Sequence, residues 1–270
     1  MTPFLARREH FDRVGSTNDD VRGWLADGTP EVCLAVADEQ TAGRGREGRA
    51  WVAPPCAALL VSLGFRPAWL APDHVWRLAA IASLAMAGAA EDTAGLVAGA
   101  VRLKWPNDLV IATGAPARVR KVAGVLGETD GLGTADPRVV IGLGINADWV
   151  AADFPPDLAA TMTSLREAAD GGPVDTAALL DAFVARLEPG IEALRAGDFD
   201  GAAWTHRQIT TGRTIRVETS TGSETHRALG VDPATGALIV EDRAVATGQR
   251  RVLVGEVTHV RLAEPIAGAV

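Results

Sequence analysis

The sequence predicts an α+β fold, in which a first part that mixes helices with strands is followed by a small β-barrel. Apolar runs of strand length alternate with helical patterns up to about residue 208. From residue 209 the chain carries short strand-like runs at close spacing, separated by turn signals such as Thr221-Gly222. A chain of 270 residues suits one large domain plus a small one. We therefore expect domains at residues 1–208 and 209–270.

The helices of the first part are predicted from cap residues and from apolar periodicity. Ser16-Thr17-Asn18 offers cap oxygens, acidic residues follow in the first turn, and Gly28 ends the helix. In the helix expected at residues 176–195, apolar side chains share one face, and Pro189 predicts a kink or break. Further helices are expected at residues 73–92 and 199–208.

Strands are predicted from apolar runs bounded by turn residues. In the first part they are residues 32–37, 57–65, 101–104, 109–112, 122–128 and 139–143. Residues 38–51 are polar and rich in Gly and Arg, so we expect a loop there, and residues 113–120 form the tip between two strands. The strands expected after residue 208 are 214–218, 224–230, 237–241, 250–254 and 256–262.

Composition and charge exclude several classes of protein. Hydrophobic residues make up 47% of the chain and the net charge is -8, so there is no global basic field for nucleic acid. Residues 1–11 lack the apolar core of a signal peptide, and the apolar run 78–90 is too short to span a membrane. We therefore expect a cytoplasmic protein that binds neither nucleic acid nor membranes. Cys33 and Cys56 sit in apolar runs and are expected to be buried thiols.

Residues 43–49 read Gly-Arg-Gly-Arg-Glu-Gly-Arg, which has the spacing of a dinucleotide-binding fingerprint. That interpretation fails, because Pro54 and Pro55 follow where the fingerprint requires a helix. The three arginines are more informative. Glycines allow close backbone approach to an anion, and guanidinium forks suit carboxylate and phosphate oxygens. The alternative interpretation is a solvated basic loop.

Three further segments place polar groups at the ends of expected strands. Residues 104–108, Lys-Trp-Pro-Asn-Asp, present a lysine and a carboxylate, although Pro-Asn-Asp is also typical of a simple turn. Lys121 opens an apolar strand, where a lysine is usually solvated but can also neutralise charge between two anions. Residues 142–146 are punctuated by glycine and end in an asparagine, which predicts either close strand packing or the approach of a ligand.

Together and in this order, these segments resemble the biotin protein ligase family, the biotin–[acetyl-CoA-carboxylase] ligases. The matching motifs are Ser16-Thr17-Asn18, residues 40–46, Gly48-Arg49 with Trp51, residues 104–108, Lys121 with Ala123-Gly124, and residues 142–146. Residues 212–217, 236–241 and 255–257 are similar to the family's C-terminal part, so nearly the whole chain is covered. The resemblance implies a mixed β-sheet catalytic domain of the biotin/lipoate ligase type, followed by a small SH3-like β-barrel.

The resemblance also implies an activity. The enzyme would activate biotin with ATP to give biotinyl-5'-AMP, and would then transfer biotin to a specific lysine of a biotin carboxyl carrier protein. Biotin and ATP are the implied substrates, with Mg²⁺ on the triphosphate, and the protein is expected to be a monomer or a homodimer. The five histidines are scattered without zinc-ligand spacing, so no protein-bound metal is expected.

Roles of individual residues follow from the resemblance. Biotin would be bound by Ser16, Thr17, Asn18, Gln40, Gly43, Arg44, Gly45, Lys121 and Gly124. ATP would be bound by Arg46, Arg49, Trp51, Lys104, Asn107, Lys121 and Asn146, with Trp51 stacked on the adenine. The catalytic residues would be Lys121, Asp108, Arg44 and Arg46, with Asp108 as base or orienting group for the acceptor lysine. We also expect residues 43–51 to be mobile without ligand.

Two departures from the family pattern and two alternatives stay open. Glu47 stands where the family often has a basic residue, and the tip at residues 113–120 is long. The chain starts at the Ser-Thr-Asn helix, without room for the DNA-binding segment of some members, so we expect a monofunctional ligase and no repressor. The alternatives are a lipoate or octanoate ligase on the same fold, and a non-catalytic sensor of biotin or its adenylate.

Overall fold

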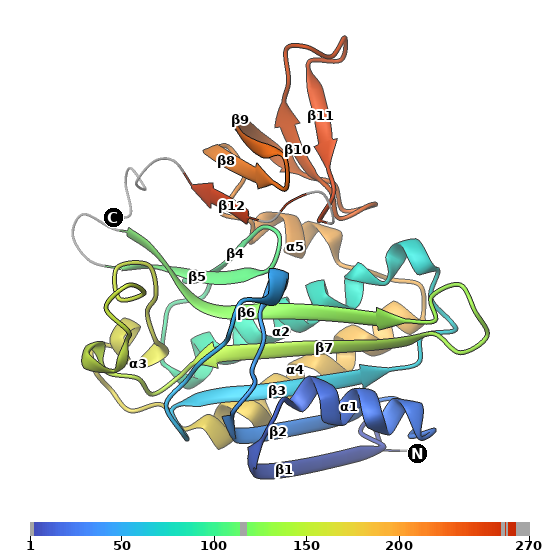
Figure 1. The fold of residues 1–270 in the computed structure, drawn as a ribbon, viewed down its shortest axis with the longest axis vertical. Helices are drawn as coiled ribbons and strands as arrows, with labels where there is room; N and C mark the ends of the chain where they lie inside the picture. Colours follow the sequence, from blue (N-terminus) through green and yellow to red (C-terminus); the bar gives the residue numbers. More distant parts are fainter. Residues whose placement is uncertain (1–2, 114–117, 255–256, 258, 263–270) are drawn as a thin grey trace.

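The computed structural model describes residues 3–113, 118–254, 257 and 259–262, and contains two separate β-sheets (Figure 1). A seven-stranded mixed sheet is built from the first part of the chain, and a five-stranded sheet from the C-terminal part lies beyond one of its edges. The predicted α+β fold class is therefore confirmed, and the strands after residue 209 belong to the second sheet.

The large sheet has the strand order β1-β2-β3-β7-β6-β5-β4. β1 pairs with β2 in parallel, and the other neighbouring strands pair antiparallel. Its strands are β1 (Arg7–Val14), β2 (Cys33–Gln40), β3 (Ala58–Phe65), β4 (Val101–Lys104), β5 (Asp108–Thr113), β6 (Arg118–Asp130) and β7 (Arg138–Asn146). Six of the seven overlap predicted strands.

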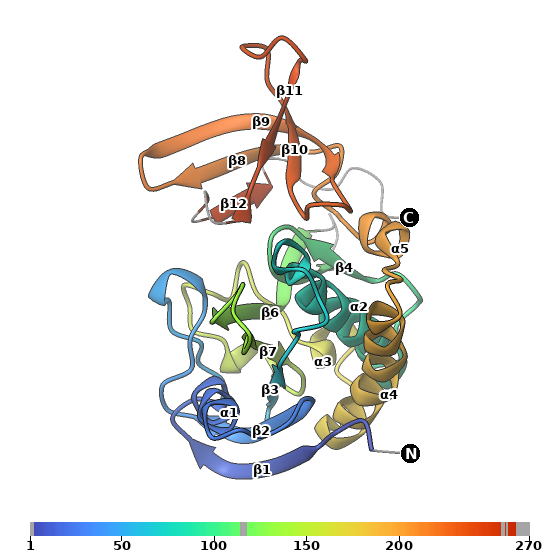
Figure 2. The same cartoon turned by 90° about the vertical axis from the view of Figure 1, so that its right-hand side faces the viewer.

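Helices cover both faces of this sheet. α2 (Trp76–Thr93) and α4 (Thr176–Arg195) lie on one side, and α1 (Thr17–Ala26) lies on the other (Figure 2). Two shorter helices, α3 (Leu165–Ala168) and α5 (Gly201–His206), and three 3-10 turns, Arg46–Gly48, Pro72–His74 and Ala151–Asp153, complete the helical structure. Asp175 caps α4 by accepting bonds from two backbone N–H groups.

The burial of β3 on both faces explains why its sequence is almost wholly apolar. Leu63 and Phe65 belong to the main core with α2 and α4. The alternate face meets α1, where a Cβ at Gly64 would lie 2.7 Å from Val21. Ser62 points to the same α1 face and is fully buried. A polar residue inside such a strand needs hydrogen-bond partners, and it has them in the site described below.

Three predictions about this part were wrong. β1 was missed because its side chains are mostly charged. It pairs with β2 at the edge of the sheet, and its Phe11 packs on Trp24 of α1. The predicted break at Pro189 does not occur, and α4 continues through Pro189, since its apolar face stays packed along α2. Cys33 is buried as expected, but Cys56 is exposed, because it lies in the irregular segment before β3 with a φ of 61°. Neither cysteine forms a disulfide.

Smaller corrections concern the predicted loops. β2 extends to Gln40, so the loop begins later than residue 38. β6 already begins at Arg118, which shortens the predicted tip, and residues 114–117 of that tip lie outside the described residues.

The C-terminal strands form an antiparallel sheet with the order β11-β10-β9-β8-β12. They are β8 (Thr214–Thr219), β9 (Gly222–Val231), β10 (Leu238–Glu241), β11 (Gln249–Val252) and β12 (His259–Leu262). Within the described part of the chain, the edge strands β11 and β12 do not pair, so this is an open sheet and not a closed barrel. Residues 256 and 258 of the predicted last strand lie outside the described residues.

The two sheets are joined through a buried tryptophan. The indole N–H of Trp105, which follows β4, donates to the carbonyl of Gly236 at 3.0 Å, and its backbone N–H donates to Oγ1 of Thr210. Leu103 of β4 pairs with the backbone at residues 207–209. We infer the domain boundary near residue 208, where the chain leaves this pairing and enters the second sheet. None of the described helices is long and apolar enough to cross a lipid bilayer.

Candidate functional site

A cavity of about 660 Å³ lies where the large sheet meets the C-terminal sheet. Its walls come from the start of α1, the Gly-Arg segment, β3, the β4–β5 turn, β6, β7 and β12. Most of the predicted site residues line it: Ser16, Thr17, Asn18, Gln40, Arg44, Gly45, Arg46, Arg49, Trp51, Lys104, Asn107, Asp108, Lys121 and Gly124. The fold therefore brings together segments that are more than 100 residues apart in the chain.

The lining is strongly cationic, although the protein carries a net charge of -8. Its basic side chains are Arg44, Arg46, Arg49, Lys104, Arg118, Lys121 and Arg261. Asp108 is the one acidic side chain among the described residues of the wall. A cavity that concentrates positive charge in an acidic protein suits a ligand with several negative charges.

Two lysines hold Asp108 at the centre of this wall. Lys104 and Asp108 face each other across the three-residue β4–β5 turn, so the turn interpretation of the Pro-Asn-Asp portion is also correct. Nζ of Lys104 lies 2.8 Å from Oδ2 of Asp108, and Nζ of Lys121 lies 2.7 Å from Oδ1. Burial alone would raise the pKa of Asp108, but the two ammonium groups outweigh burial and hold the pKa well below its usual range. The two ammonium groups thus stabilise the carboxylate form of Asp108.

The backbone around Lys121 is irregular in a way that turns its side chain into the cavity. The register between β5 and β6 shifts after Leu109, so Val110 pairs with Lys121 and Val122 is the additional residue of a bulge. Lys121 also pairs with the segment before α3: its N–H donates to Thr161, and its carbonyl accepts from Thr163. Lys121 is therefore fixed from both sides, and its side chain is 29% exposed.

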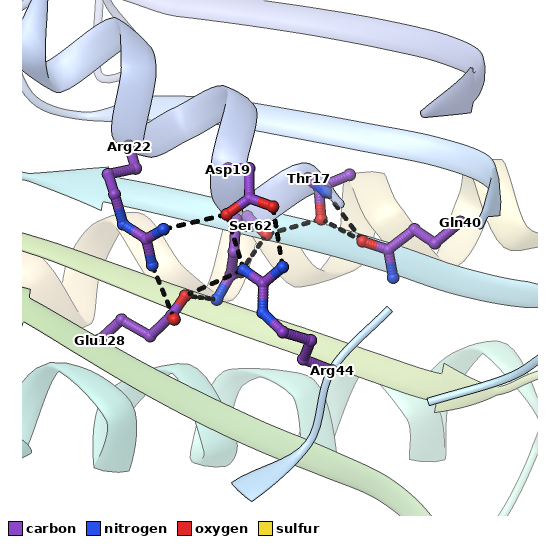
Figure 3. Close-up of polar contacts among 8 residues, drawn as sticks. Thr17, Asp19, Arg22, Gln40, Arg44, Ser62 and Glu128 are labelled. Carbon is purple, nitrogen blue, oxygen red and sulfur yellow. Dashed lines mark hydrogen bonds and ion pairs between the residues drawn. The ribbon is translucent and has the colours of Figure 1, made fainter. Parts of the chain in front are cut away.

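A neutral polar network occupies the α1 end of the cavity (Figure 3). The backbone N–H and the hydroxyl of Thr17 both donate to Oε1 of Gln40, at 2.8 and 3.0 Å. Oγ1 of Thr17 lies 2.7 Å from Oγ of Ser62, which donates to Oδ1 of Asn18. Nδ2 of Asn18 donates to Glu128. Ser16 is the N-cap residue, but its side chain makes no capping bond and lines the cavity instead.

Glycines of β6 and β7 form a flat floor between the two ends. A Cβ at Gly144 would lie 2.5 Å from the Trp51 indole, and one at Gly124 would lie 3.1 Å from it. At Gly142 a Cβ would lie 2.2 Å from Oδ1 of Asn18. Close packing therefore accounts for these glycines, and it places the Trp51 ring over the strands, with Nζ of Lys121 5.3 Å from the ring centroid. In the described structure, the buried indole N–H of Trp51 has no hydrogen-bond partner.

Residues 43–51 form a small hairpin, which we call the Gly-Arg hairpin. The N–H of Trp51 donates to Gly43, and the N–H of Gly45 donates to Arg49. At its tip, Arg46 donates to the carbonyls of Val254 and Val257, at 3.0 and 2.6 Å. Burial lowers the pKa of Arg46 from its usual value, a shift that leaves the guanidinium charged at neutral pH. The hairpin thus reaches from the large sheet to the C-terminal sheet.

Two predicted site residues do not line the cavity. Gly43 lies at the base of the hairpin, where a Cβ would meet the Trp51 carbonyl at 2.5 Å. Asn146 is fully buried at the end of β7, and its Nδ2 donates to the carbonyl of Thr163. Asn107, which does line the cavity, donates to the carbonyl of Val125. The two asparagines therefore anchor backbone around Lys121 and Asp108.

Sequence reasoning missed four contributors to the site: Ser62, Asp19, Glu128 and β12. A serine in the apolar run Ala-Leu-Leu-Val-Ser-Leu-Gly-Phe was a signal, since a buried hydroxyl needs a partner. Glu128 closing an apolar strand was another. The strand predicted at residues 256–262 was not expected in the site, yet Val260, Arg261 and Leu262 of β12 complete the wall. No cluster of acidic, histidine or cysteine side chains able to hold a metal occurs among the described residues.

Comparison with known proteins agrees with this picture. Residues 11–146 match the model of the biotin/lipoate A/B protein ligase family. The chain is 31% identical over 256 residues to the biotin–[acetyl-CoA-carboxylase] ligase of Mycobacterium tuberculosis, covering 92% of this chain and 87% of that protein. It is 30% identical over 234 residues to the bifunctional ligase/repressor BirA of Bacillus subtilis, covering 86% of this chain and 68% of that protein.

The fold is also shared with solved structures. The biotin protein ligase of Aquifex aeolicus, in complex with biotin and ATP, superimposes with a TM-score of 0.76 at 23% identity, covering 95% of this chain and 99% of that one. The family match, the two sequence relatives and this shared architecture agree with the motifs that line the cavity. The chain belongs to the biotin/lipoate A/B protein ligase family.

Proposed function

We propose that this protein is a biotin protein ligase: it forms biotinyl-5'-AMP from biotin and ATP, and transfers biotin to a lysine of a biotin carboxyl carrier protein. The observation that carries the proposal is a single cavity with a neutral polar network at one end and a cluster of cations at the other. Biotin has an uncharged ureido ring, which suits the neutral polar network, and a carboxylate, which suits the cluster of cations. Relatives named biotin–[acetyl-CoA-carboxylase] ligase support the choice.

The ureido ring would bind at the α1 end of the cavity. It offers N–H and C=O groups that require oriented partners when buried. Thr17 and Asn18 are 2% and 5% exposed, and Gln40 is held by Thr17. Ser16 and the backbone of Gly45 and Gly124 would complete the contacts. The Ser62 hydroxyl fixes the orientation of Thr17 and Asn18 before the ligand arrives.

The reaction joins two anions, since the biotin carboxylate attacks the α-phosphate of ATP. Lys121 would lie between the carboxylate and the α-phosphate, and Arg46 and Arg49 would contact the phosphates. Lys104 lies close to Lys121, because both bind the carboxylate of Asp108. Preorganised positive charge lowers the barrier because it is already in place when negative charge develops. Trp51 would cover the adenine, and Asn107 and Asn146 would support the nucleotide end from behind.

Mg²⁺ would enter with the triphosphate. Among the described residues of the wall, Asp108 is the one carboxylate, and two lysines already hold it, so the phosphates themselves would supply the oxygen ligands of the ion. The ion, when bound, supplies charge neutralisation on the leaving pyrophosphate.

In the transfer step the acceptor lysine must be neutral when it attacks the acyl carbon. Asp108 is a poor base, because its lowered pKa makes it a weak proton acceptor. Its carboxylate would instead orient Lys121 and the incoming ammonium group. The enzyme would act in the cytoplasm, where ATP is available, as a monomer or a homodimer.

The decisive experiment is ATP-dependent transfer of biotin to a purified biotin carboxyl carrier domain. Isotope exchange between pyrophosphate and ATP, with biotin or lipoate as the acid, distinguishes the alternatives. Exchange with biotin followed by transfer supports the proposal. Exchange with lipoate alone would identify a lipoate ligase, and binding without exchange would identify a sensor.

A further inference from the structure

Four charged side chains form a closed ring beside the cavity, and just one of them, Arg44, was assigned a site role from the sequence (Figure 3). Asp19 and Arg22 come from α1, Glu128 from β6, and Arg44 from the Gly-Arg hairpin. Asp19, Arg22 and Glu128 do not belong to the described cavity wall, so they contact no ligand placed in it. Their role has to be exerted through Arg44 or through α1.

The contacts of Arg44 are those of a fixed group. Nη1 of Arg44 donates to Oδ2 of Asp19 at 2.8 Å, and Nη2 donates to Oδ1 at 2.6 Å. This two-bond arrangement matches the fork of a guanidinium to a carboxylate and fixes orientation as well as distance. Nη2 also lies 3.9 Å from Oε2 of Glu128.

Arg22 holds the two acids in place. Its Nη1 lies 2.9 Å from Oδ1 of Asp19, and its Nη2 lies 2.7 Å from Oε1 of Glu128. Glu128 in turn accepts from Nδ2 of Asn18, a member of the neutral polar network. The ring therefore links the base of the hairpin to the pocket end proposed for the ureido ring.

The charge of Arg44 is thereby neutralised within the protein. The hydrogen bond to Asp19 raises the pKa of Arg44, and the same bond lowers the pKa of Asp19. Arg44 was assigned from the sequence as one of the cations that attract the reacting anions. Its geometry is instead that of an anchor, whereas Lys121 and Lys104 share one carboxylate between two ammonium groups and retain an excess positive charge.

The place of Arg44 in the hairpin makes such an anchor effective. Arg44 pairs with Ala50 across the base of the hairpin, directly before the Gly45 to Arg49 hydrogen bond. Arg46 holds the tip on the C-terminal sheet. The hairpin is thus attached at its base to α1 and at its tip to the carbonyls of Val254 and Val257, between β11 and β12, and the Asp19 contact is the attachment nearest the ureido end.

We propose that Asp19 is a positioning residue for biotin: by holding Arg44, it keeps the Gly-Arg hairpin closed over the α1 end of the cavity. The biotin part of this inference rests on the proposed function, whereas the hold of Asp19 on the hairpin does not. Asp19→Asn removes the charge and one of the two acceptor oxygens. Since the pair is partly exposed, we expect about a two- to fivefold effect.

The test compares Asp19→Asn with Asp20→Asn, a matched control. Asp20 is the next residue on α1, carries the same charge, and pairs with no arginine in the described structure. Hydrogen exchange of residues 43–51 is measured without ligand, and the Kd for biotin is measured by calorimetry. Asp19→Asn should exchange about two- to fivefold faster in the hairpin and weaken the binding of biotin by a similar factor. Asp19→Glu, which keeps the charge, should recover part of both effects.

The outcomes separate the two proposals. Unchanged hairpin exchange in Asp19→Asn, or an equal change in Asp20→Asn, would overturn the assignment of Asp19. Faster exchange with unaltered biotin affinity would overturn its role in biotin binding. A wild-type protein that binds no biotin would overturn the proposed function, and the exchange data would still decide whether Asp19 holds the hairpin.

Discussion

The ammonium group of Lys121 lies 2.7 Å from Oδ1 of Asp108, and the Asp108 carboxylate is shared with Lys104. Two positive charges meet one negative charge in a wall where Asp108 is 8% exposed. The surplus of one positive charge is what the proposed reaction requires between a carboxylate and a phosphate. The first three predictions follow from this trio.

Lys121→Ala should reduce the rate of biotinyl-adenylate formation by about 100-fold or more, as expected for loss of a preorganised charge at reacting groups. Labelled biotin and ATP in a single-turnover assay measure this rate. Lys121→Arg keeps the charge and should retain more activity than the alanine variant. Wild-type rates in Lys121→Ala would refute the role.

Asp108→Asn should slow the transfer of biotin more than its adenylation. The amide leaves the two lysines charged but removes the anion that orients Lys121 and the acceptor lysine. Adenylation is followed by release of pyrophosphate, and transfer is followed with preformed biotinyl-5'-AMP and a carrier domain. An equal loss in both steps would contradict a specific role in transfer.

The stability contributed by Asp108 should be independent of pH between about 5 and 8. Its pKa in the folded protein is lowered, so its stabilising contribution is present above the unfolded pKa and is lost as pH falls through the folded pKa. Urea unfolding should show Asp108→Asn destabilised by about 3 kcal/mol at pH 8 and at pH 5. The difference should shrink only in strong acid, and a difference that already fades near pH 6 would contradict the assignment.

Arg46→Gly should free the tip of the Gly-Arg hairpin from the C-terminal sheet. The variant loses the bonds to the Val254 and Val257 carbonyls and gains backbone freedom. We expect several-fold more adenylate released into solution, because a loose hairpin neither excludes water from the intermediate nor retains it. Chemical trapping of free adenylate without a carrier measures the leak, and an unchanged yield would argue against a retaining role.

Gly144→Ala should lower adenylation by about tenfold, since a Cβ at that position would lie 2.5 Å from the Trp51 indole and displace it. Gly127→Ala on the neighbouring strand is the control, because a Cβ there meets the Ile141 side chain at 3.6 Å, an ordinary contact. Tryptophan fluorescence reports the displacement. Equal behaviour of the two variants would show that the Trp51 position is irrelevant.

The sequence predicted helices and strands correctly where burial of one face imposes a periodic apolar pattern. The predicted ends of α4 and of β4 agree with the structure, because both segments bury an apolar face that repeats at helical or strand spacing. β1 was missed for the converse reason. Its stability comes from backbone pairing with β2 and from Arg7 and Phe11 on Trp24, none of which leaves an apolar pattern.

Motifs predicted which residues belong to the site, but not the ion pairs and hydrogen bonds that join them. Lys104 and Asp108 could be placed near one another from a short turn, but the bond from Lys121 to Asp108 depends on a bulge that no local signal marks. The ring around Arg44 joins residues 25 and more than 80 positions apart. Asn146 carries a motif typical of ligand contact, yet the fold uses its amide to hold the backbone of Thr163.

The indole bond from Trp105 to Gly236 has a consequence for the whole enzyme. Trp105 lies between Lys104 and the rest of the turn that carries Asp108, so the frame that aligns the reacting charges is braced by the C-terminal sheet. Trp105 is 1% exposed in the folded protein, and separating the C-terminal sheet from it would expose its ring and free the β4–β5 turn. Disrupting the contact between the two sheets should therefore abolish catalysis even where the larger sheet stays folded.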